Sequence, residues 1–257
     1  MTLSSAFAPG RAALVGYLPA GFAGVDAFKA MVDNGVDVVE VGLPYSDPLM
    51  DGPVIQAAVQ RALDAKTGTR DVLATVEGVA ALGVPVVVMT YWNPVERYGA
   101  AAFARDLRSA GGAGAITPDL IPEEAGEWLE AVRAHDLDPV FLVAPSSTRE
   151  RIEVVARTNG GFVYAASTMG VTGTRDAVSD VAPALVARVR EATSLPVCVG
   201  LGVSNGAQAA QVAAYADGVI VGSAFVRAVL DADSPRAANA ALGMLAADLA
   251  AGCRGSI

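Results

Sequence analysis

The stretch Val38-Val39-Glu40-Val41-Gly42 has the composition of a buried β-strand, with a single carboxylate among β-branched residues. Similar short runs rich in Val, Ile and Ala recur along the chain, and longer amphipathic stretches separate them. Parallel strands that are covered on both faces are nearly continuous apolar runs of this kind, and helices connect them. The stretch therefore predicts one strand of a parallel α/β sheet.

The recurrence of this pattern predicts eight strands and eight helical stretches. We expect strands at Ala12 to Leu18, Val36 to Val41, Pro85 to Met89, Gly114 to Thr117, Pro139 to Val143, Phe162 to Ala166, Pro196 to Gly200 and Gly218 to Val221. We expect helices at Val25 to Asn34, Pro53 to Ala65, Ala101 to Ala110, Glu123 to His135, Thr148 to Ala156, Val178 to Ala192, Asn205 to Ala214 and Pro235 to Ala251. Eight alternating units favour a closed TIM (β/α)8 barrel with extra short helices. No linker or composition shift divides the chain, so we expect residues 1–257 to form a single domain.

Composition excludes several classes of function. The formal net charge of −9 and the absence of Lys and Arg clusters argue against a nucleic-acid surface. Cys198 and Cys253 lie far apart, which indicates no disulfide framework and no CxxC metal site. The first residues lack the pattern of a signal peptide, and no charge-free apolar stretch is long enough for a membrane span. We therefore expect a cytoplasmic protein that contacts no membrane.

Glu40 is the first candidate catalytic residue. Side chains alternate between the inside and the outside of a barrel strand, so Val38 and Glu40 should face one way while Val39 and Val41 face the other. Glu40 then points into the barrel mouth, where partial desolvation raises the pKa of a carboxyl group and suits it to proton exchange near neutral pH. The alternative is a structural acid that is paired with a buried donor.

Asp51 is the second candidate. It precedes Gly52-Pro53, where a helix is expected to begin with Pro53 in its first turn. The loop that contains Asp51, residues 43 to 52, is one of two long connections, and the other runs from Ser167 to Ser179. Asp51 could cap the helix or interact with its dipole. Its place on the same barrel face as Glu40 favours the functional role instead.

Three glycine-bearing loops follow the last three predicted strands, and they indicate a phosphate site. They are Gly170-Val171-Thr172-Gly173, Gly200-Leu201-Gly202-Val203-Ser204 and Val221-Gly222-Ser223-Ala224. In barrels, the loops after the seventh and eighth strands and a short extra helix bind phosphate through backbone N–H groups. Such a site needs few cations, so an acidic protein can still bind a phosphorylated substrate. Ser223 could add a hydroxyl donor, whereas glycine in any one loop also closes ordinary turns.

Aromatic residues and the single histidine carry weaker signals. Tyr164 could point inward on its strand, either as a packed barrel residue or with its hydroxyl in the site. Phe22 could line an apolar pocket, although ordinary packing also explains it. His135 lies at an expected helix end, where a surface or dipole role is favoured over catalysis.

Along nearly its whole length the chain resembles the tryptophan synthase alpha subunit. The run Glu40-Val41-Gly42-Leu43-Pro44-Tyr45-Ser46-Asp47-Pro48-Leu49-Met50-Asp51-Gly52-Pro53 is the most specific match. The other matching stretches are Gly16 to Gly21, Tyr91 to Pro94 with Tyr98-Gly99, Pro118 to Glu124, Tyr164 to Gly173, Gly200 to Ser204, and Gly222-Ser223. Their order along the chain is more diagnostic than any one motif.

The resemblance implies a TIM barrel that cleaves indole-3-glycerol phosphate to indole and glyceraldehyde 3-phosphate by a retro-aldol reaction, with no metal and no cofactor in this chain. By position, Glu40 would be the acid/base catalyst, Asp51 would hold the indole N–H, and Tyr164 would position the substrate and Glu40. The implied phosphate group consists of Gly173, Gly200, Gly202, Gly222 and Ser223. The implied pocket or loop positions are Phe22, Ile55, Met89 and Thr172, and Thr172 would bond Asp51 on loop closure.

The resemblance also implies a partner, a beta subunit that uses pyridoxal phosphate, in an alpha2beta2 complex. Pro44, Asp47 and their loop would form part of that interface. Many relatives have Ser-Arg before the loop that follows Ala166, whereas this chain has Ser167-Thr168-Met169, so the charge contacts of that loop differ. Two other functions stay open at this point: a non-catalytic module that activates a beta subunit, and a phosphate-binding barrel isomerase.

Overall fold

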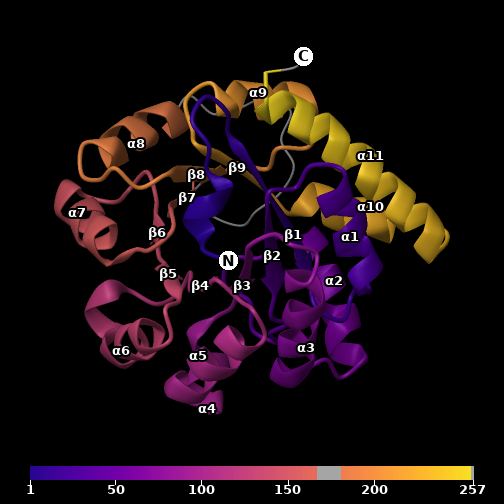
Figure 1. The fold of residues 1–257 in the computed structure, drawn as a ribbon, viewed down its shortest axis with the longest axis horizontal. Helices are drawn as coiled ribbons and strands as arrows, with labels where there is room; N and C mark the ends of the chain where they lie inside the picture. Colours follow the sequence, from indigo (N-terminus) through magenta and orange to yellow (C-terminus); the bar gives the residue numbers. More distant parts are fainter. Residues whose placement is uncertain (167–180, 256–257) are drawn as a thin grey trace.

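The structure, a computed structural model, describes residues 1–166 and 181–255. A central parallel sheet lies inside a ring of helices (Figure 1). The strands in the described residues are β1 (Ala13–Pro19), β2 (Val38–Gly42), β3 (Val86–Met89), β4 (Gly114–Ile116), β5 (Asp138–Val140), β6 (Leu142–Val143), β7 (Val163–Ala166), β8 (Val197–Gly200) and β9 (Gly218–Val221). Each of these strands overlaps a strand that the apolar runs predict.

The sheet closes into a barrel. Its strand order is β5-β4-β3-β2-β1-β9-β8-β7-β6, and every pairing is parallel. The two ends of this order, β5 and β6, are consecutive halves of the one strand predicted at residues 139 to 143, and only Phe141 separates them. The side chain of Asn159 accepts a hydrogen bond from the Phe141 N–H at 2.9 Å and donates to the Phe141 carbonyl at 3.1 Å. The predicted eight-stranded TIM barrel is therefore confirmed, with one strand interrupted.

The helices lie outside the barrel and follow the predicted alternation. The predicted helices correspond to α1 (Val25–Asp33), α2 (Pro53–Asp64), α5 (Ala100–Ser109), α6 (Gly126–Ala134), α7 (Arg149–Thr158), α8 (Val181–Arg190), α9 (Gly206–Ala213) and α11 (Pro235–Cys253). The additional ones are α3 (Thr69–Ala80), α4 (Trp92–Tyr98), α10 (Ser223–Leu230) and two 3-10 turns, η1 (Leu3–Ala6) and η2 (Pro122–Glu124). The turn η2 occupies the predicted start of α6, and His135 is the C-cap of α6, as expected for a helix end.

Strand alternation divides the core into two clusters. Val38 belongs to a small cluster inside the barrel, whereas Val39 and Val41 belong to the large cluster between the sheet and the helices. This confirms the predicted alternation on β2. Leu3 and Ala6 of η1 are buried in the inner cluster. The N-terminal segment therefore fills the end of the barrel where the strands begin.

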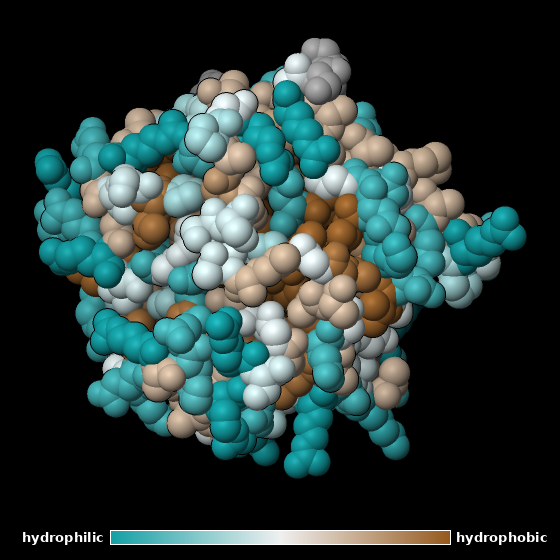
Figure 2. All heavy atoms as spheres, viewed as in Figure 1, coloured by the Kyte–Doolittle hydropathy of each residue, from teal (hydrophilic) through white to brown (hydrophobic). Residues whose placement is uncertain are grey.

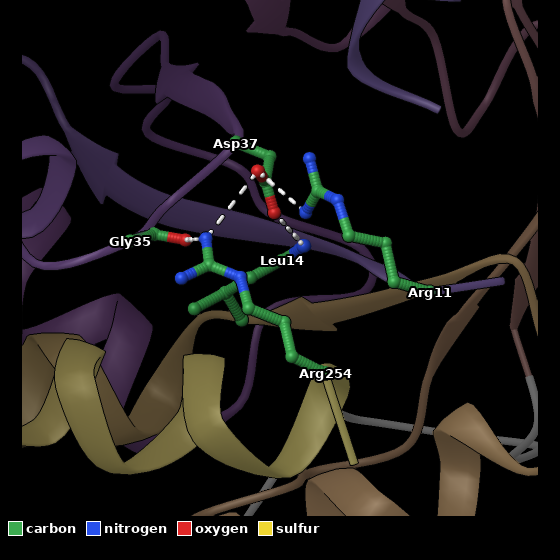
Figure 3. Close-up of polar contacts among 5 residues, drawn as sticks. All are labelled: Arg11, Leu14, Gly35, Asp37 and Arg254. Carbon is green, nitrogen blue, oxygen red and sulfur yellow. Dashed lines mark hydrogen bonds and ion pairs between the residues drawn. The ribbon is translucent and has the colours of Figure 1, made fainter. Parts of the chain in front are cut away.

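An aspartate fastens the start of β2 to its neighbours (Figure 3). Asp37 accepts a hydrogen bond from the Leu14 N–H at 2.9 Å and pairs with Arg11 at 2.8 Å and Arg254 at 3.6 Å. Arg254 also donates to the Gly35 carbonyl at 3.1 Å. These contacts join β1, β2 and the end of α11 at the face of the barrel where the strands begin.

A second aspartate repeats this arrangement at the start of β9. Asp217 accepts a hydrogen bond from the Val197 N–H of β8 at 2.9 Å, and its other oxygen pairs with Arg190 at 2.9 Å. Both aspartates directly precede a strand, and each accepts an N–H from the first two residues of a neighbouring strand. Each aspartate carboxylate thus supplies a hydrogen-bond acceptor at the start of the sheet. A buried strand N–H without a partner would lower the stability of the fold there.

Hydrophilic residues line the rim of the molecule in Figure 2, and hydrophobic residues show mainly in a recess near the middle of that face. Among the described residues, a few large apolar side chains are strongly exposed, and Leu49 in the loop after β2 is 73% exposed.

None of the helices in the described ranges combines the length and hydropathy that a bilayer span requires. The two cysteines, Cys198 and Cys253, are free and buried.

Candidate active site

A cavity lies at the mouth of the barrel, where the parallel strands end. Its walls come from β1, β2, β3, β6, β7, β8 and β9, from the segments that follow β2 and β8, and from the starts of α2 and α10. Its lining residues are Tyr17, Glu40, Met50, Asp51, Ile55, Met89, Leu142, Tyr164, Ala166, Gly200, Leu201, Gly202, Ile220, Gly222 and Ser223. The sequence predicted the carboxylates, Tyr164 and the glycines of this set at the same barrel face, and the cavity brings them together.

Glu40 reaches the cavity from β2. In the strand register it stands opposite Tyr17 of β1 and Val87 of β3, so both neighbouring strands flank it. Its side chain is only 3% exposed, and its Oε2 atom has no hydrogen-bond partner among the described residues. Burial, and secondarily the charge of Asp51, raises the pKa of Glu40 to about 8. Among the described residues, no donor is bonded to the Glu40 Oε2 atom. The alternative role for Glu40, a structural carboxylate paired with a buried donor, is therefore not observed.

Asp51 reaches the cavity from the loop that joins β2 to α2. The N-cap of α2 is Gly52, which makes no side-chain capping bond, and α2 has no acidic residue in its first turn. Gln56 fixes the main chain here by donating to the Asp51 carbonyl at 2.7 Å. The capping role that the sequence left open for Asp51 is thus not observed. Burial raises the pKa of Asp51 to about 6, against a hydrogen bond from Tyr91 that lowers it.

The two carboxyl groups differ in protonation near neutral pH. With a pKa of about 8, Glu40 is mostly protonated at pH 7, whereas Asp51 with a pKa of about 6 is mostly ionised. A pair of titratable groups whose pKa values are separated by their surroundings can supply an acid and a base at the same pH. The cavity therefore holds one proton donor and one anionic acceptor.

Backbone N–H groups and one hydroxyl form the opposite wall of the cavity. Gly200 ends β8, Gly222 is the N-cap of α10, and Ser223 is the first residue of α10 and is 6% exposed. The first N–H groups of a helix have no partner within the helix and carry a partial positive charge, so they attract anions. Gly202 has φ of +74°, a backbone conformation that favours glycine. This wall suits a phosphate group.

Two tyrosines, Tyr17 and Tyr164, also line the cavity. A Cβ atom at Gly200 would lie 2.6 Å from the Tyr164 hydroxyl oxygen, and one at Gly42 would lie 2.5 Å from that of Tyr17. Glycine at both positions therefore leaves the space that each ring occupies. Burial raises the pKa of Tyr17 and Tyr164 well above the ordinary value, so both hydroxyls stay neutral. They can donate or accept hydrogen bonds but do not act as bases.

Comparison with known proteins shows the family of this chain. The family model "Tryptophan synthase alpha chain" matches residues 3–253. The chain belongs to the tryptophan synthase alpha chain family. This places it among the carbon–carbon lyases of tryptophan biosynthesis, which cleave indole-3-glycerol phosphate, and it decides against the isomerase alternative. The alpha chain works without a cofactor of its own. Within residues 1–166 and 181–255, no three His, Cys, Asp or Glu side chains are grouped so that they could hold a metal ion.

Relatives in this family match almost end to end. The tryptophan synthase alpha chain of Acidothermus cellulolyticus is 61% identical over 251 residues, which cover 96% of this chain and 93% of the relative. That of Thermobifida fusca is 58% identical and covers 98% of this chain and 96% of its own length. A solved structure of Mycobacterium tuberculosis tryptophan synthase superposes with a TM-score of 0.90 at 56% identity, covering 95% of this chain and 93% of that chain.

The structure places the remaining predicted residues of this alpha chain as follows. Ile55 and Met89 line the cavity. Phe22 lines a separate hollow beside the starts of α1 and α11, because the chain turns sharply after β1, with the Phe22 N–H bonded to the Pro19 carbonyl at 3.4 Å. Phe22 is not among the residues that line the cavity with Glu40, and its role as a pocket or loop residue stays a prediction. Thr172 and Gly173 lie outside the described residues.

Sequence reasoning assigned no role to several residues that line the cavity. Those side chains are Tyr17, Met50, Leu142, Leu201 and Ile220. Strand alternation could have found Tyr17, because it stands opposite Glu40 in the register of β1 and β2. No local signal points to Tyr91, whose hydroxyl contacts the loop that carries Asp51.

Proposed function

We propose that Glu40 and Asp51 carry out the cleavage of indole-3-glycerol phosphate in this chain, with Glu40 as the proton-transfer residue. The observation that carries the proposal is that both carboxyl groups line one cavity, with different pKa values, opposite a wall of glycines and Ser223. The substrate has an aromatic N–H at one end and a phosphate at the other. The cavity offers a partner for each end.

Glu40 acts on both sides of the bond that breaks. Its carboxyl proton goes to C3 of the indole ring, which gives a cationic ring that can accept electrons. The proton of the adjacent glycerol hydroxyl then returns to the Glu40 carboxylate, the hydroxyl becomes the aldehyde, and the electrons of the carbon–carbon bond return to the ring. The net result is transfer of one proton from oxygen to carbon, and indole and glyceraldehyde 3-phosphate are formed.

Asp51 holds the other end of the ring. Its ionised carboxylate accepts a hydrogen bond from the indole N–H, which becomes more acidic when C3 is protonated. This interaction is stronger in the transition state than in the ground state, and such differential interactions accelerate the chemical step. Burial strengthens it further, because the effective dielectric constant of the cavity is lower than that of water.

The wall formed by Gly200, Gly202, Gly222 and Ser223 binds the substrate phosphate, together with Gly173. The N-terminus of α10 supplies N–H donors and the favourable end of the helix dipole. Tyr164 lines the same cavity beside Gly200 and positions the substrate, while Ile55 and Met89 contact its apolar part. Thr172, which follows β7 in the sequence, is proposed to contribute as well. No cation is required, which suits a protein with a net charge of −9.

We further propose that the chain acts in the cytoplasm as one domain, paired with a beta subunit in an alpha2beta2 complex that contains pyridoxal phosphate in the partner. The related M. tuberculosis structures are of tryptophan synthase, two of them in aminoacrylate-bound forms. The loop after β2 supports such an interface, because Leu49 is 73% exposed there. Pro44 and Asp47 belong to the same loop.

A complex with an unreactive indole alkyl phosphate tests the proposal. We expect its phosphate at Gly200, Gly202, Gly222 and Ser223, and its indole N–H within hydrogen-bond distance of the Asp51 carboxylate, with C3 near Glu40. A ligand whose indole ring lies outside the cavity, or whose phosphate meets another surface, would overturn the assignment. Titration of the Asp51→Asn variant with the same ligand measures how much that residue contributes to binding.

A further inference from the structure

A second cavity lies at the face of the barrel where the strands begin, opposite the active site. Its walls come from the segments before β1, β8 and β9 and from the ends of α8, α9 and α11. Its volume is about 580 Å³, which is within the range of small-molecule sites. Among the described residues, the two cavities have no lining residue in common. A ligand of this second cavity would therefore bind apart from Glu40 and Asp51.

The charged side chains of the second cavity are mainly cationic. Among the described residues, three arginines line it, namely Arg11, Arg190 and Arg254, and Asp217 is the only carboxylate that does. This excess of positive charge contrasts with the whole chain, which carries a formal net charge of −9. Charge of one sign inside a hollow raises the local concentration of small ions of the opposite sign. The cavity therefore suits an anion, although the protein as a whole is acidic.

Two of these arginines are held side by side by one carboxylate (Figure 3). Nη1 of Arg11 lies 2.8 Å from Oδ1 of Asp37, and Nη2 of Arg254 lies 3.6 Å from the same oxygen. The other oxygen of Asp37 accepts the Leu14 N–H. A single carboxylate can balance only one of the two guanidinium charges. The pair therefore retains a positive charge at the wall of the cavity.

The guanidinium groups also retain hydrogen-bond donors. Each carries five N–H donors. Among the described residues, the bonded nitrogens are Nη1 of Arg11, Nη2 of Arg254, and Nη2 of Arg190, which lies 2.9 Å from Asp217. In Figure 3, Nη2 of Arg11 and Nη1 of Arg254 make no bond to the residues drawn. The remaining N–H groups suit a carboxylate or a phosphate, whose oxygens accept two parallel bonds from one guanidinium.

Much of the remaining wall is apolar. Phe7, Pro9 and Ala213 contribute to it, and Tyr215 lies in the same wall. The Tyr215 hydroxyl oxygen is buried and has no hydrogen-bond partner among the described residues. Buried polar atoms without a partner are rare, and an anion bound beside Tyr215 would give this hydroxyl an acceptor. The wall thus offers apolar contacts for the body of a ligand as well as donors for its charged group.

We propose that the second cavity is an accessory binding site for a small organic anion, which carries a carboxylate or a phosphate ester on an apolar body. The guanidinium groups of Arg11, Arg190 and Arg254 bind the acidic group, and the apolar wall binds the body. This site is independent of the proposed catalytic roles, because it contains none of the residues to which they are assigned.

The test is calorimetric titration of the full chain with phenyl phosphate and, separately, with benzoate. We expect a component of binding that Arg190→Gln weakens about tenfold, the scale of one lost hydrogen bond between charged groups, and that Ser223→Ala in the active site leaves unchanged. Added KCl should weaken the same component, because salt screens the attraction between charges. Such a component with phenyl phosphate alone assigns the site to phosphate esters, and with benzoate alone to carboxylates. Equal affinities of wild type and Arg190→Gln for both probes would overturn the proposal.

Ala214→Glu is a second variant, which keeps all three arginines in place. Ala214 is the exposed C-cap residue of α9 and lines the second cavity. A carboxylate there repels an anion and occupies the arginines, so the component should disappear. Unchanged binding of both probes in a folded Ala214→Glu variant would also overturn the proposal.

Arg105→Gln is the matched control. It removes one positive charge that is paired with Asp106 and lies outside both cavities. Its affinity for each probe should equal that of the wild type, and kcat for the cleavage reaction should be unchanged in both Arg105→Gln and Arg190→Gln. If Arg105→Gln weakened binding as much as Arg190→Gln, the effect would be one of net charge, and the assignment of a site would be wrong.

Discussion

Glu40 and Asp51 line the same cavity, and the charge of Asp51 is the second cause, after burial, that raises the pKa of Glu40. The two residues are therefore electrostatically coupled. While Asp51 is ionised, Glu40 retains its proton more strongly, and this is the state in which an indole N–H acceptor and a proton donor coexist.

Replacing Glu40 by Gln should lower kcat for the cleavage reaction by about 10²-fold or more, because acid/base help is usually worth 10² to 10⁴. Binding of an indole alkyl phosphate should change little. Glu77→Gln, on the exposed side of α3, is the matched control and should keep the wild-type rate. A folded Glu40→Gln variant with near-normal turnover would refute the proton-transfer role.

The rate should depend on pH as a bell. Asp51 must be ionised, so kcat/KM should fall as the pH drops below about 6, and Glu40 must be protonated, so it should fall again above about 8. Measurement of kcat/KM from pH 5 to 9 checks both limbs. In the Asp51→Asn variant the acid limb should disappear, and a limb that persisted there would belong to another group.

Glu40 should also make stability depend on pH. Its pKa is about 8 in the folded protein and near 4.5 when exposed, so between these values the folded state keeps a proton that the unfolded state has lost. The free energy of unfolding should therefore decrease as the pH rises through this window, by at most about 1.4 kcal/mol per pH unit. Denaturant titrations of wild type and Glu40→Gln at pH 5 and pH 8 should show this component only in the wild type. Equal pH dependence in both would contradict the raised pKa.

Ser223→Ala should weaken substrate binding through the phosphate. A hydrogen bond to a charged group is worth about 1.5–3 kcal/mol, so KM should rise about tenfold or more while kcat changes little. Ser234→Ala removes the hydroxyl that caps α11 at Ala237, outside the cavity, and should lower stability without raising KM. A drop in kcat alone for Ser223→Ala would place that serine at the reacting carbons instead.

Asp37→Ala should destabilise the fold by about 1–3 kcal/mol, because it leaves the Leu14 N–H without its acceptor and separates Arg11 and Arg254 from their partner. Equilibrium unfolding in urea measures this. Asp33→Ala removes an exposed pair with Lys29 and should cost at most about 0.5 kcal/mol. The prediction is wrong if both variants lose the same small amount.

Much of the fold could be predicted because each strand is an apolar run with its own boundaries. Phe141 shows the limit: it lies in the middle of a predicted strand, yet the ladder stops there and the Asn159 amide replaces it. Helix α3 also has a clear apolar face of Val72, Val76 and Val79. It is not among the expected helices, because one helix per strand already satisfies the barrel pattern.

The site was predictable where a residue's place on a strand fixes its direction, and less so in loops. Glu40 lies on β2, so alternation alone aims it into the barrel. Asp51 lies in an irregular loop, where Tyr91 and Gln56 bond to the main chain of Met50 and Asp51, and no local pattern connects these residues to it. For Phe22, the resemblance implies a pocket or loop position. The turn after β1 directs this residue into another hollow.

The ion pair between Asp37 and Arg254 fixes the end of α11 at the face of the barrel where the strands begin. The active-site cavity opens at the other face. A tether attached after residue 255 would therefore leave the molecule on the side remote from the substrate entrance. An enzyme immobilised on a bead through that end should keep the active-site entrance directed to the solution. A fluorophore placed there would report tumbling without obstructing the active-site cavity.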